Sequence, residues 1–414
     1  FIARWICTRW PSFFEKIISP TPFHLVGYPW GSWDSNWWPD FSLSADKIEW
    51  FLEKSRWPSV DGVIAFNADL IPNLINLTGE IELPKYDKKM TADNVILALQ
   101  HAVEFEYDKS ENKPKQIIGD MMPILVERLF EVSEKNPLPL ILSLHDSLKN
   151  RDIQMHFNEP ELQNFVDKQD WSGKQKQRDD DYLMVVNSNI AGGKTDNVVR
   201  QTETLYTNIE ADGSVVHTLA ITRTHNGNMN DVFERVNNVS YIRVYTPENS
   251  QLIEVTGANK PDQKYFKDPM VGYISDEYLN TIETNKYIDE KSGTDVYNEN
   301  NKKVFGNWLQ VEPGQSSTLT VTYRVPANKQ TVDGWQKWFA KLTNKWHLYQ
   351  SYSFYWQRQS GSNTGFEHQL TIAGKKKIIW NDSSGKKQEI IDNKLLTSGE
   401  LDTDVIIALI FEKS

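Results

Sequence analysis

The sequence predicts an α/β domain over residues 1–186, followed by an all-β sandwich domain over residues 187–414 with inserted loops. Up to residue 186, short apolar runs alternate with stretches whose apolar residues recur at helical spacing, which is typical of α/β layers. After Asn187, short segments of alternating apolar and polar residues are separated by turn residues, as in sandwiches. The length of 414 residues also exceeds one ordinary core, so two domains are expected.

The first 60 residues are a Trp-rich segment of the first domain. They hold eight of the 15 tryptophans, and repeated prolines exclude one long helix. Two interpretations stay open. The segment either packs on a core, or forms a surface that stacks on carbohydrate or binds a protein partner.

The regular elements of the first domain are expected in the order strand, helix, strand, three helices, strand, helix, strand. Their residues are 61–66, 70–77, 81–84, 91–105, 117–133, 138–149, 153–157, 160–168 and 182–186. Gly79 is the expected C-terminal stop of the first helix, and Thr91 is the expected N-cap of the second. The continuous apolar run from Tyr182 to Val186 predicts a buried strand that closes the domain.

The second domain is expected to consist of many short strands. The candidates are residues 198–209, 215–223, 241–245, 252–256, 308–311, 317–325, 352–358, 367–372, 378–381 and 405–411. Asp212-Gly213 between the first two is a hairpin signal. The polar stretch Lys260–Lys303 predicts an inserted arm or long loop, and aromatic residues at helical spacing in Val332–Tyr349 predict a helix packed on the sandwich.

The composition excludes several classes of function. A formal net charge of -11 disfavours nucleic acid as a partner and adsorption to an anionic membrane. The single cysteine, Cys7, allows no intrachain disulfide, and the sequence has no Walker loop, no GxSxG and no GxGxxG after a strand. No apolar run is long enough to span a bilayer. Since the chain begins at Phe1, we expect any signal or membrane anchor in a segment that precedes it.

The first motif with possible chemistry is Asp34-Ser-Asn-Trp-Trp-Pro-Asp40-Phe41. The carboxylates of Asp34 and Asp40 are candidate catalytic groups and candidate ligands of a divalent cation such as Mg²⁺, and Asn36, Trp37 and Trp38 are candidate ligand-binding residues. The alternative is a turn closed by Pro39, in which the polar side chains bond their own backbone.

The second motif is Asn187-Ser-Asn189-Ile-Ala-Gly192-Gly193-Lys194-Thr-Asp196, directly after the predicted buried strand. Ligands often bind beyond the carboxyl ends of strands in α/β sheets. The candidate ligand-binding residues are Asn189, Gly192, Gly193, Lys194 and Asp196. The glycines would let the backbone approach a ligand, and Lys194 would neutralise an anion. The equally open alternative is an interdomain junction fixed by ion pairs of Lys194 and Asp196.

These motifs resemble a known family. Asp34–Phe41 resembles the Asp-Ala-Asn-Trp-Ser-Pro-Asp-Phe signature of the domain of unknown function 4012 (DUF4012) family, and residues 60–65, 77–79, 91–95 and 182–196 follow that family's order. Members look like membrane-anchored bacterial envelope proteins. Val60–Leu83 is also similar to LytR-CpsA-Psr glycopolymer transferases, which hold a polyprenyl pyrophosphate with arginines, an aspartate and a divalent ion. That similarity implies such a role for Asp34 and Asp40 and a LytR-CpsA-Psr-like first domain.

The sequence departs from the family pattern where the anion would be held. Trp33 stands where the family usually has an arginine, and the family's upstream stretch is not recognisable. An anion site needs cationic partners, and the only candidates are Arg4, Arg9, Arg56 and Lys194.

Two functions are therefore expected. The first is a non-catalytic surface or scaffold protein of the cell envelope that binds a glycan or a partner protein and reaches the membrane only through a preceding anchor. The second is a transferase or hydrolase of polyprenyl-pyrophosphate-linked glycopolymers. An arginine cluster facing Asp34 would favour the second function, and its absence would favour the first.

Overall fold

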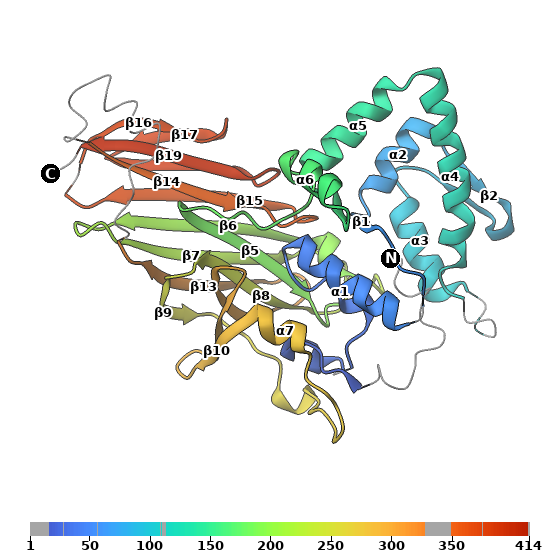
Figure 1. Cartoon of the computed structure of the whole chain (residues 1–414), viewed down its shortest axis with the longest axis horizontal. Coiled ribbons are helices and arrows are strands. Elements are labelled where there is room, and N and C mark those ends of the chain that lie inside the picture. The colour runs from blue at the N-terminus through green and yellow to red at the C-terminus, as the bar shows by residue number, and fades with distance from the viewer. Residues whose placement is uncertain are drawn as a thin grey trace. The chain divides into compact units, whose positions relative to one another are not determined.

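A computed structural model describes residues 16–27, 29–55, 57–107, 109, 113–327, 349–374 and 376–412 of the chain (Figure 1). These residues fall into two compact units. Unit 1 contains Gly31–Lys174, and unit 2 contains Gln175–Ser414 together with a segment that ends at Trp30. The division therefore lies at Lys174, upstream of the predicted boundary at residue 186.

Unit 1 is a mixed α/β region, as predicted, in which helices predominate. Its longer elements are α1 (Phe41–Lys54), β1 (Gly62–Phe66), α2 (Leu70–Thr78), β2 (Ile81–Leu83), β3 (Lys88–Met90), α3 (Val95–Phe105), α4 (Gln116–Lys135), α5 (Leu138–Lys149), β4 (Ile153–Phe157) and α6 (Pro160–Lys168). Strand β1 pairs with β4, and β2 pairs with β3, in both cases antiparallel. A LytR-CpsA-Psr-like fold is thus not confirmed.

The core of unit 1 follows from helical spacing. In α4 the buried residues Ile117, Met121 and Leu125 recur every fourth position, so they lie on one face. They join the cluster that also contains Leu74 of α2 and Leu99 of α3. Burial of this apolar face, rather than helix propensity alone, stabilises such helices.

The Trp-rich segment contains a helix that was not predicted, because repeated prolines interrupt the sequence of this segment. Helix α1 begins directly after Pro39 and Asp40, and Asp40 accepts a hydrogen bond from the backbone N–H of Ser42 at 3.0 Å. Phe41 and Ala45, one turn apart, are both buried. Pro39 lies before the first turn, where a missing N–H costs no helical hydrogen bond, so the segment accommodates a helix of 14 residues.

Unit 2 is rich in β-structure, as predicted, and two large sheets form it. Its longer elements are β5 (Asp181–Asn189), β6 (Val199–Ile209), β7 (Val215–His225), β8 (Asn238–Pro247), β9 (Gln251–Thr256), α7 (Glu277–Ile282), β10 (Glu283–Asp289), β11 (Thr294–Glu299), β12 (Lys302–Val311), β13 (Ser316–Val325), β14 (Tyr349–Gln357), β15 (Thr364–Ile372), β16 (Ile378–Asp382), β17 (Lys387–Ile391), β18 (Lys394–Glu400) and β19 (Val405–Glu412). The eight-stranded sheet has the order β10-β11-β12-β8-β5-β14-β19-β16, and the seven-stranded sheet has the order β17-β18-β15-β6-β7-β13-β9.

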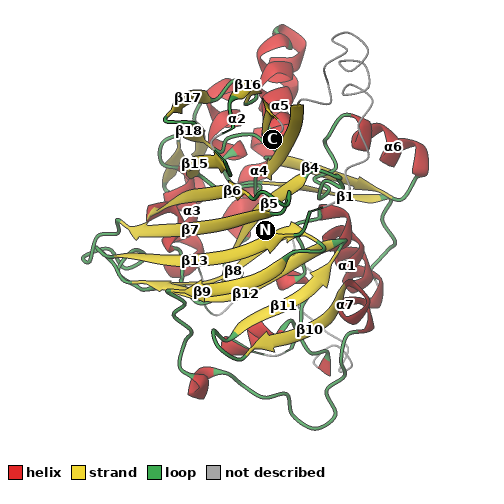
Figure 2. Ribbon diagram, turned by 90° about the vertical axis from the view of Figure 1, so that its left-hand side faces the viewer, coloured by secondary structure: helices red, strands yellow, loops and turns green. Residues whose placement is uncertain are grey.

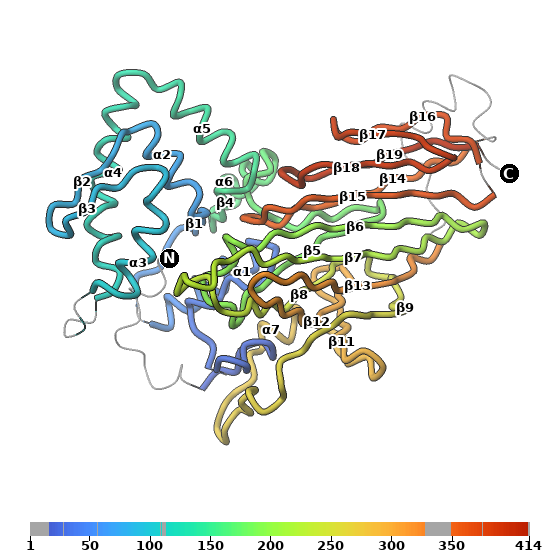
Figure 3. Tube along the Cα trace, turned by 180° about the vertical axis from the view of Figure 1, so that it is seen from behind, coloured from blue at the N-terminus to red at the C-terminus, as the bar shows by residue number. Residues whose placement is uncertain are grey.

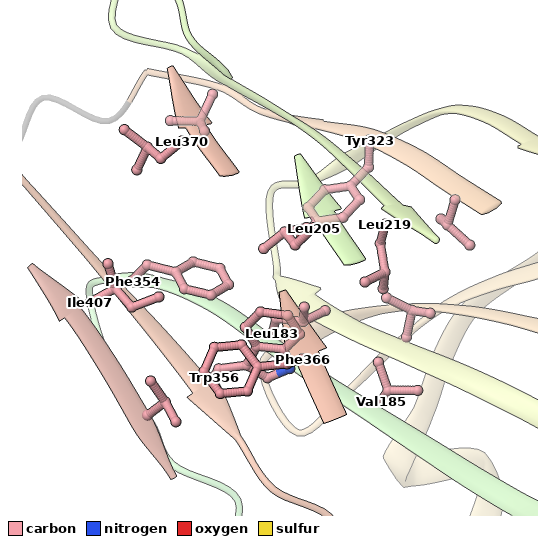
Figure 4. Close-up of a cluster of buried hydrophobic side chains, with 14 of the residues drawn as sticks. Leu183, Val185, Leu205, Leu219, Tyr323, Phe354, Trp356, Phe366, Leu370 and Ile407 are labelled. Atoms are coloured by element: carbon pink, nitrogen blue, oxygen red, sulfur yellow. The ribbon is translucent and has the colours of Figure 1, made fainter. Parts of the chain in front are cut away.

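The two sheets face each other across one apolar core, and Figure 2 shows them as layers. Leu183 of β5 and Trp356 of β14 contribute from the eight-stranded sheet, while Leu205 of β6 and Phe366 of β15 contribute from the seven-stranded sheet (Figure 4). Along β6 the burial alternates residue by residue, with the odd-numbered residues buried and the even-numbered residues facing outward. This alternation is the period of two that a sheet with one buried face requires.

Two expectations for the second half need revision, and a third is not tested by the described residues. Strand β5 does not close the first domain: it lies in the eight-stranded sheet, antiparallel to β8 and parallel to β14. The polar stretch 260–303 is not merely a loop, because it contains α7, β10 and β11. The helix predicted for Val332–Tyr349 lies outside the described residues, apart from Tyr349 itself, which begins β14. None of the described helices is long and apolar enough to cross a membrane.

Candidate functional site

The motif Asp34–Phe41 leads into helix α1 of unit 1, and much of it is built into the fold. The carboxylate of Asp40 caps α1 through the N–H of Ser42, so it stabilises the positive end of the helix. Trp37 and Trp38 are buried, with 3% and 2% of their surface exposed, and Asn36 is exposed. The burial favours the packing interpretation of these tryptophans, since neither indole presents an open ring face.

Asp34 has the most perturbed carboxyl of this motif. It ends a short 3-10 helix, Ser32–Asp34, and is half-buried. Burial raises the pKa of Asp34 to about 6, and a hydrogen bond with the Trp33 side chain acts in the opposite direction. The group can thus exchange a proton near neutral pH, which is a property of general acids and bases.

The expected partners of an anion or metal site are not assembled in the described part of unit 1. Its two described arginines contact other groups: Arg128 donates to the carbonyl oxygens of Gly79 and Glu80, and Arg151 pairs with Asp170 at 3.7 Å. Among the residues with described positions, no group of three or more His, Cys, Asp or Glu side chains could hold a metal ion. Arg4, Arg9 and Arg56 lie outside the described residues.

The second motif forms a tightly bonded loop within unit 2. The Oδ1 of Asn189 accepts the backbone N–H of Gly192 at 2.7 Å, and its Nδ2 donates to Asp196 at 3.0 Å. Asp196 also accepts from Asn238 at 2.8 Å and pairs with Arg223 at 3.3 Å. Gly192 is buried so close to Asn189 that a Cβ atom would lie 2.6 Å from its Oδ1.

These contacts explain why the loop contains its glycines. Gly192 is required by close approach, and Gly193 has a φ of +60°, a conformation that L-residues rarely adopt. Lys194 is exposed at the surface of the loop. The ion pair of Asp196 therefore fixes the loop inside unit 2, and a ligand-binding role for these residues remains a prediction.

A different candidate site lies on the outer face of the seven-stranded sheet, which faces the viewer in Figure 3. Here a hollow of about 220 Å³ crosses β17, β18, β15 and β6. Two rows of side chains line it, each row formed by residues paired across neighbouring strands. The first row consists of Lys387, Ser398, Glu367 and Thr204. The second row consists of Glu389, Leu396, Gln369 and Tyr206.

The hollow combines an aromatic ring with hydroxyl, amide, carboxylate and ammonium groups. Tyr206 is 48% exposed, although tyrosine rings usually pack at least partly into the protein. Beside it stand the amide of Gln369 and the carboxylate of Glu367, and Lys387 pairs with Glu389 at 2.9 Å. Such a surface can stack on an apolar ring face while donating to and accepting from hydroxyl groups around it.

Sequence reasoning did not find this site. Its residues come from β6 and from three strands more than 150 positions later, so no compact motif marks it. The one available signal was the alternation in β6, which places Thr204 and Tyr206 on the face opposite the core. Neither the register of β15 against β6 nor their parallel pairing can be read from the sequence.

Comparisons with known proteins give one informative match. No curated protein matches the sequence. Solved structures with partial likeness include a candidate nutrient-binding protein from Legionella pneumophila, with 9% identity, a TM-score of 0.29 and coverage of 55% of this chain and 70% of that chain. An M1 zinc metallopeptidase from Deinococcus radiodurans has 8% identity, a TM-score of 0.23 and coverage of 51% and 42%. Yeast LTA4 hydrolase has 9% identity, a TM-score of 0.24 and coverage of 51% and 29%.

These structural likenesses are too low to carry an argument about fold or activity. Similarity to LytR-CpsA-Psr transferases is not shown by any comparison. A family model described as "Protein of unknown function (DUF4012)" matches residues 18–103, which include the motif Asp34–Phe41. The match supports the DUF4012 family for this chain.

Proposed function

We propose that this chain is a binding protein of the bacterial cell envelope that recognises glycans through the hollow on its seven-stranded sheet. The observation that carries the proposal is the exposed ring of Tyr206 between polar side chains of neighbouring strands. Sugar rings present apolar C–H faces and hydroxyl edges. An exposed aromatic ring with nearby amide, hydroxyl and carboxylate groups complements both features.

The size of the hollow supports recognition of part of a larger molecule. Its volume of about 220 Å³ is below the roughly 300–1,000 Å³ of pockets that enclose small ligands. Its floor is a sheet rather than a mobile loop, because the side chains of β6, β15, β18 and β17 are held by continuous strand pairing. A shallow, preformed surface loses little conformational entropy on binding. The envelope location in this proposal comes from the family resemblance.

A glycan array and a pull-down with purified cell-wall polysaccharide test the proposal. We expect the wild-type chain to bind, and Tyr206→Ala to lose most of the affinity because the stacking ring is removed. The matched control is Tyr287→Ala, which removes a tyrosine that is 55% exposed on β10 of the other sheet. Binding that survives Tyr206→Ala, or is lost equally in both variants, would contradict the assignment of the site.

A further inference from the structure

We propose that the hollow is one end of an elongated track, and that the ligand is an uncharged, hydroxyl-rich polymer lying across the strands. This inference rests on the proposed glycan-binding function and extends it to the class and length of the ligand. Its basis is the continuation of the row of Tyr206 across the remaining strands of the sheet. Tyr206 is paired with Thr218 of β7, and Thr218 with Thr322 of β13.

A pair of hydroxyl groups lies on this continuation. Thr218 and Thr322 hydrogen-bond through their side-chain oxygens at 3.2 Å. A second pair lies four residues further along both strands, where the side-chain oxygens of Thr222 and Thr318 are 2.9 Å apart. These side chains face outward and are half-buried or exposed. The β7–β13 pair thus presents two hydroxyl pairs on its outer face, separated by the pair of Ala220 and Thr320, and the first of them lies next to the aromatic ring.

Each hydroxyl pair keeps hydrogen-bonding capacity for a ligand. One hydroxyl carries one donor and two acceptor positions, and a pair uses one donor and one acceptor internally. The remaining donor and lone pairs suit a partner that can both donate and accept hydrogen bonds. Sugar hydroxyl groups do both. Threonine is also restricted at χ1, so its hydroxyl is held in place before binding.

The charges along the track select against polyanions. The hollow contains two carboxylates, Glu367 and Glu389, and one cation, Lys387, which already pairs with Glu389. Beyond Tyr206, the paired positions Thr218 and Thr322 are uncharged. A phosphate-rich polymer would meet a net negative charge in the hollow, so a neutral polysaccharide fits better.

The geometry also sets the length of the ligand. The row crosses seven strands from Glu389 of β17 to Glu254 of β9, and neighbouring strands lie about 4.8 Å apart, so its full span is about 29 Å. A disaccharide would fill only the hollow, whereas a longer oligomer would reach the hydroxyl pair of Thr218 and Thr322. Affinity should therefore increase with chain length.

Titration calorimetry with chito-oligosaccharides of two, four and six sugars tests the track. We expect the hexamer to bind roughly tenfold more tightly than the dimer. The double variant Thr218→Val, Thr322→Val should bind the dimer like the wild type and lose the advantage of the hexamer, because valine keeps the shape and removes the hydroxyls. Thr284→Val, an exposed threonine of β10, is the matched control.

The outcomes separate the two proposals. Equal affinity for all lengths, or a double variant that retains the preference for the hexamer, overturns the track while glycan binding at Tyr206 stands. Binding of dextran sulfate in preference to the neutral oligomers overturns the assigned ligand class. Absence of binding at every length, in a chain shown to be folded, overturns the proposed function and the track together.

Discussion

Glu203 offers a quantitative test of the sandwich core. Its side chain lies between the two sheets with 2% of its surface exposed. Its Oε1 accepts a hydrogen bond from Nε2 of Gln201 at 2.8 Å, and its Oε2 accepts from Nε1 of Trp356 at 3.1 Å. Burial raises the pKa of Glu203 to about 7, and the two hydrogen bonds only partly oppose this effect.

The perturbation is Glu203→Gln, and its effect depends on pH. The pKa rises from 4.5 in the unfolded chain to about 7 in the folded chain, so the folded state binds the extra proton between these values. The contribution of this protonation to the unfolding free energy is fully present below pH 4.5 and is lost as pH rises through 7. From about pH 5 to about pH 8 the wild type should lose roughly 2.5 kcal/mol of unfolding free energy through this group. Glutamine does not ionise, so the variant should not show this loss.

The variant is expected to fold because its partners can adapt. The Oε1 of Gln201 has no hydrogen-bond partner among the described residues. Rotation of that amide would let Gln201 accept from the new glutamine, while Trp356 still donates to the new carbonyl oxygen. The variant side chain at position 203 then keeps its hydrogen bonds to Trp356 and Gln201, and Gln201 keeps one partner as in the wild type.

Urea denaturation at about pH 5 and about pH 8 measures this difference. The control is Glu254→Gln, which alters an exposed carboxylate on β9. We expect the control to follow the wild type, and Glu203→Gln to gain stability relative to both at the higher pH. An unchanged pH dependence in Glu203→Gln would show that Glu203 is not the group responsible and that its carboxyl is better solvated than the structure indicates.

Two further predictions concern a helix cap and a buried imidazole. Asp40→Ala should destabilise unit 1 by about 1 kcal/mol, because the N–H of Ser42 loses its partner, whereas Asp40→Asn should retain most of the stability in the same thermal unfolding assay. Burial, reinforced by the nearby His217, lowers the pKa of His368 to about 3, against an opposing effect of Asp181. The ring resonances of His368 in NMR spectra should therefore stay constant down to about pH 4, while the contribution of His368 to stability falls as pH drops below 6.5; a midpoint near 6.5 would contradict this burial.

The strands of unit 2 were largely predictable because their pattern is local. Strand β6 alternates buried and outward residues along its whole length, and Gly213 in the following turn has a φ of +84°, as the Asp212-Gly213 signal implied. The pairing of β5 was not predictable. A continuous apolar run indicates a strand covered on both faces, but not that its neighbours are β8 and the distant β14.

The candidate site was likewise only partly predictable from the sequence. The motif Asp34–Phe41 was conspicuous in sequence, yet Trp37 and Trp38 proved to be buried and Asp40 a helix cap. A cluster of aromatic residues in the sequence does not indicate whether their rings are buried or exposed. The alternation in β6 placed Tyr206 on the outer face, but its role depends on Gln369 in the neighbouring strand, which the sequence did not indicate.

The buried face of the seven-stranded sheet determines what its outer face can do. The hydroxyl of Thr207 on β6 hydrogen-bonds with His217 of β7 at 2.9 Å and with His368 of β15 at 2.8 Å. His217 in turn contacts Asp181 at 2.7 Å. This chain of polar groups links three adjacent strands inside the core, where a lost hydrogen bond is expensive.

These core contacts hold the register of the strands that form the proposed track. Side chains alternate between faces, so a slip of one residue would bring Tyr206 into the core and expose Thr207. The slip would break the hydrogen bonds of Thr207 with both imidazoles. A buried polar chain therefore specifies a single register. The same register keeps the aromatic ring and the hydroxyl pairs aligned on the opposite face, where a long, flexible ligand needs a rigid surface.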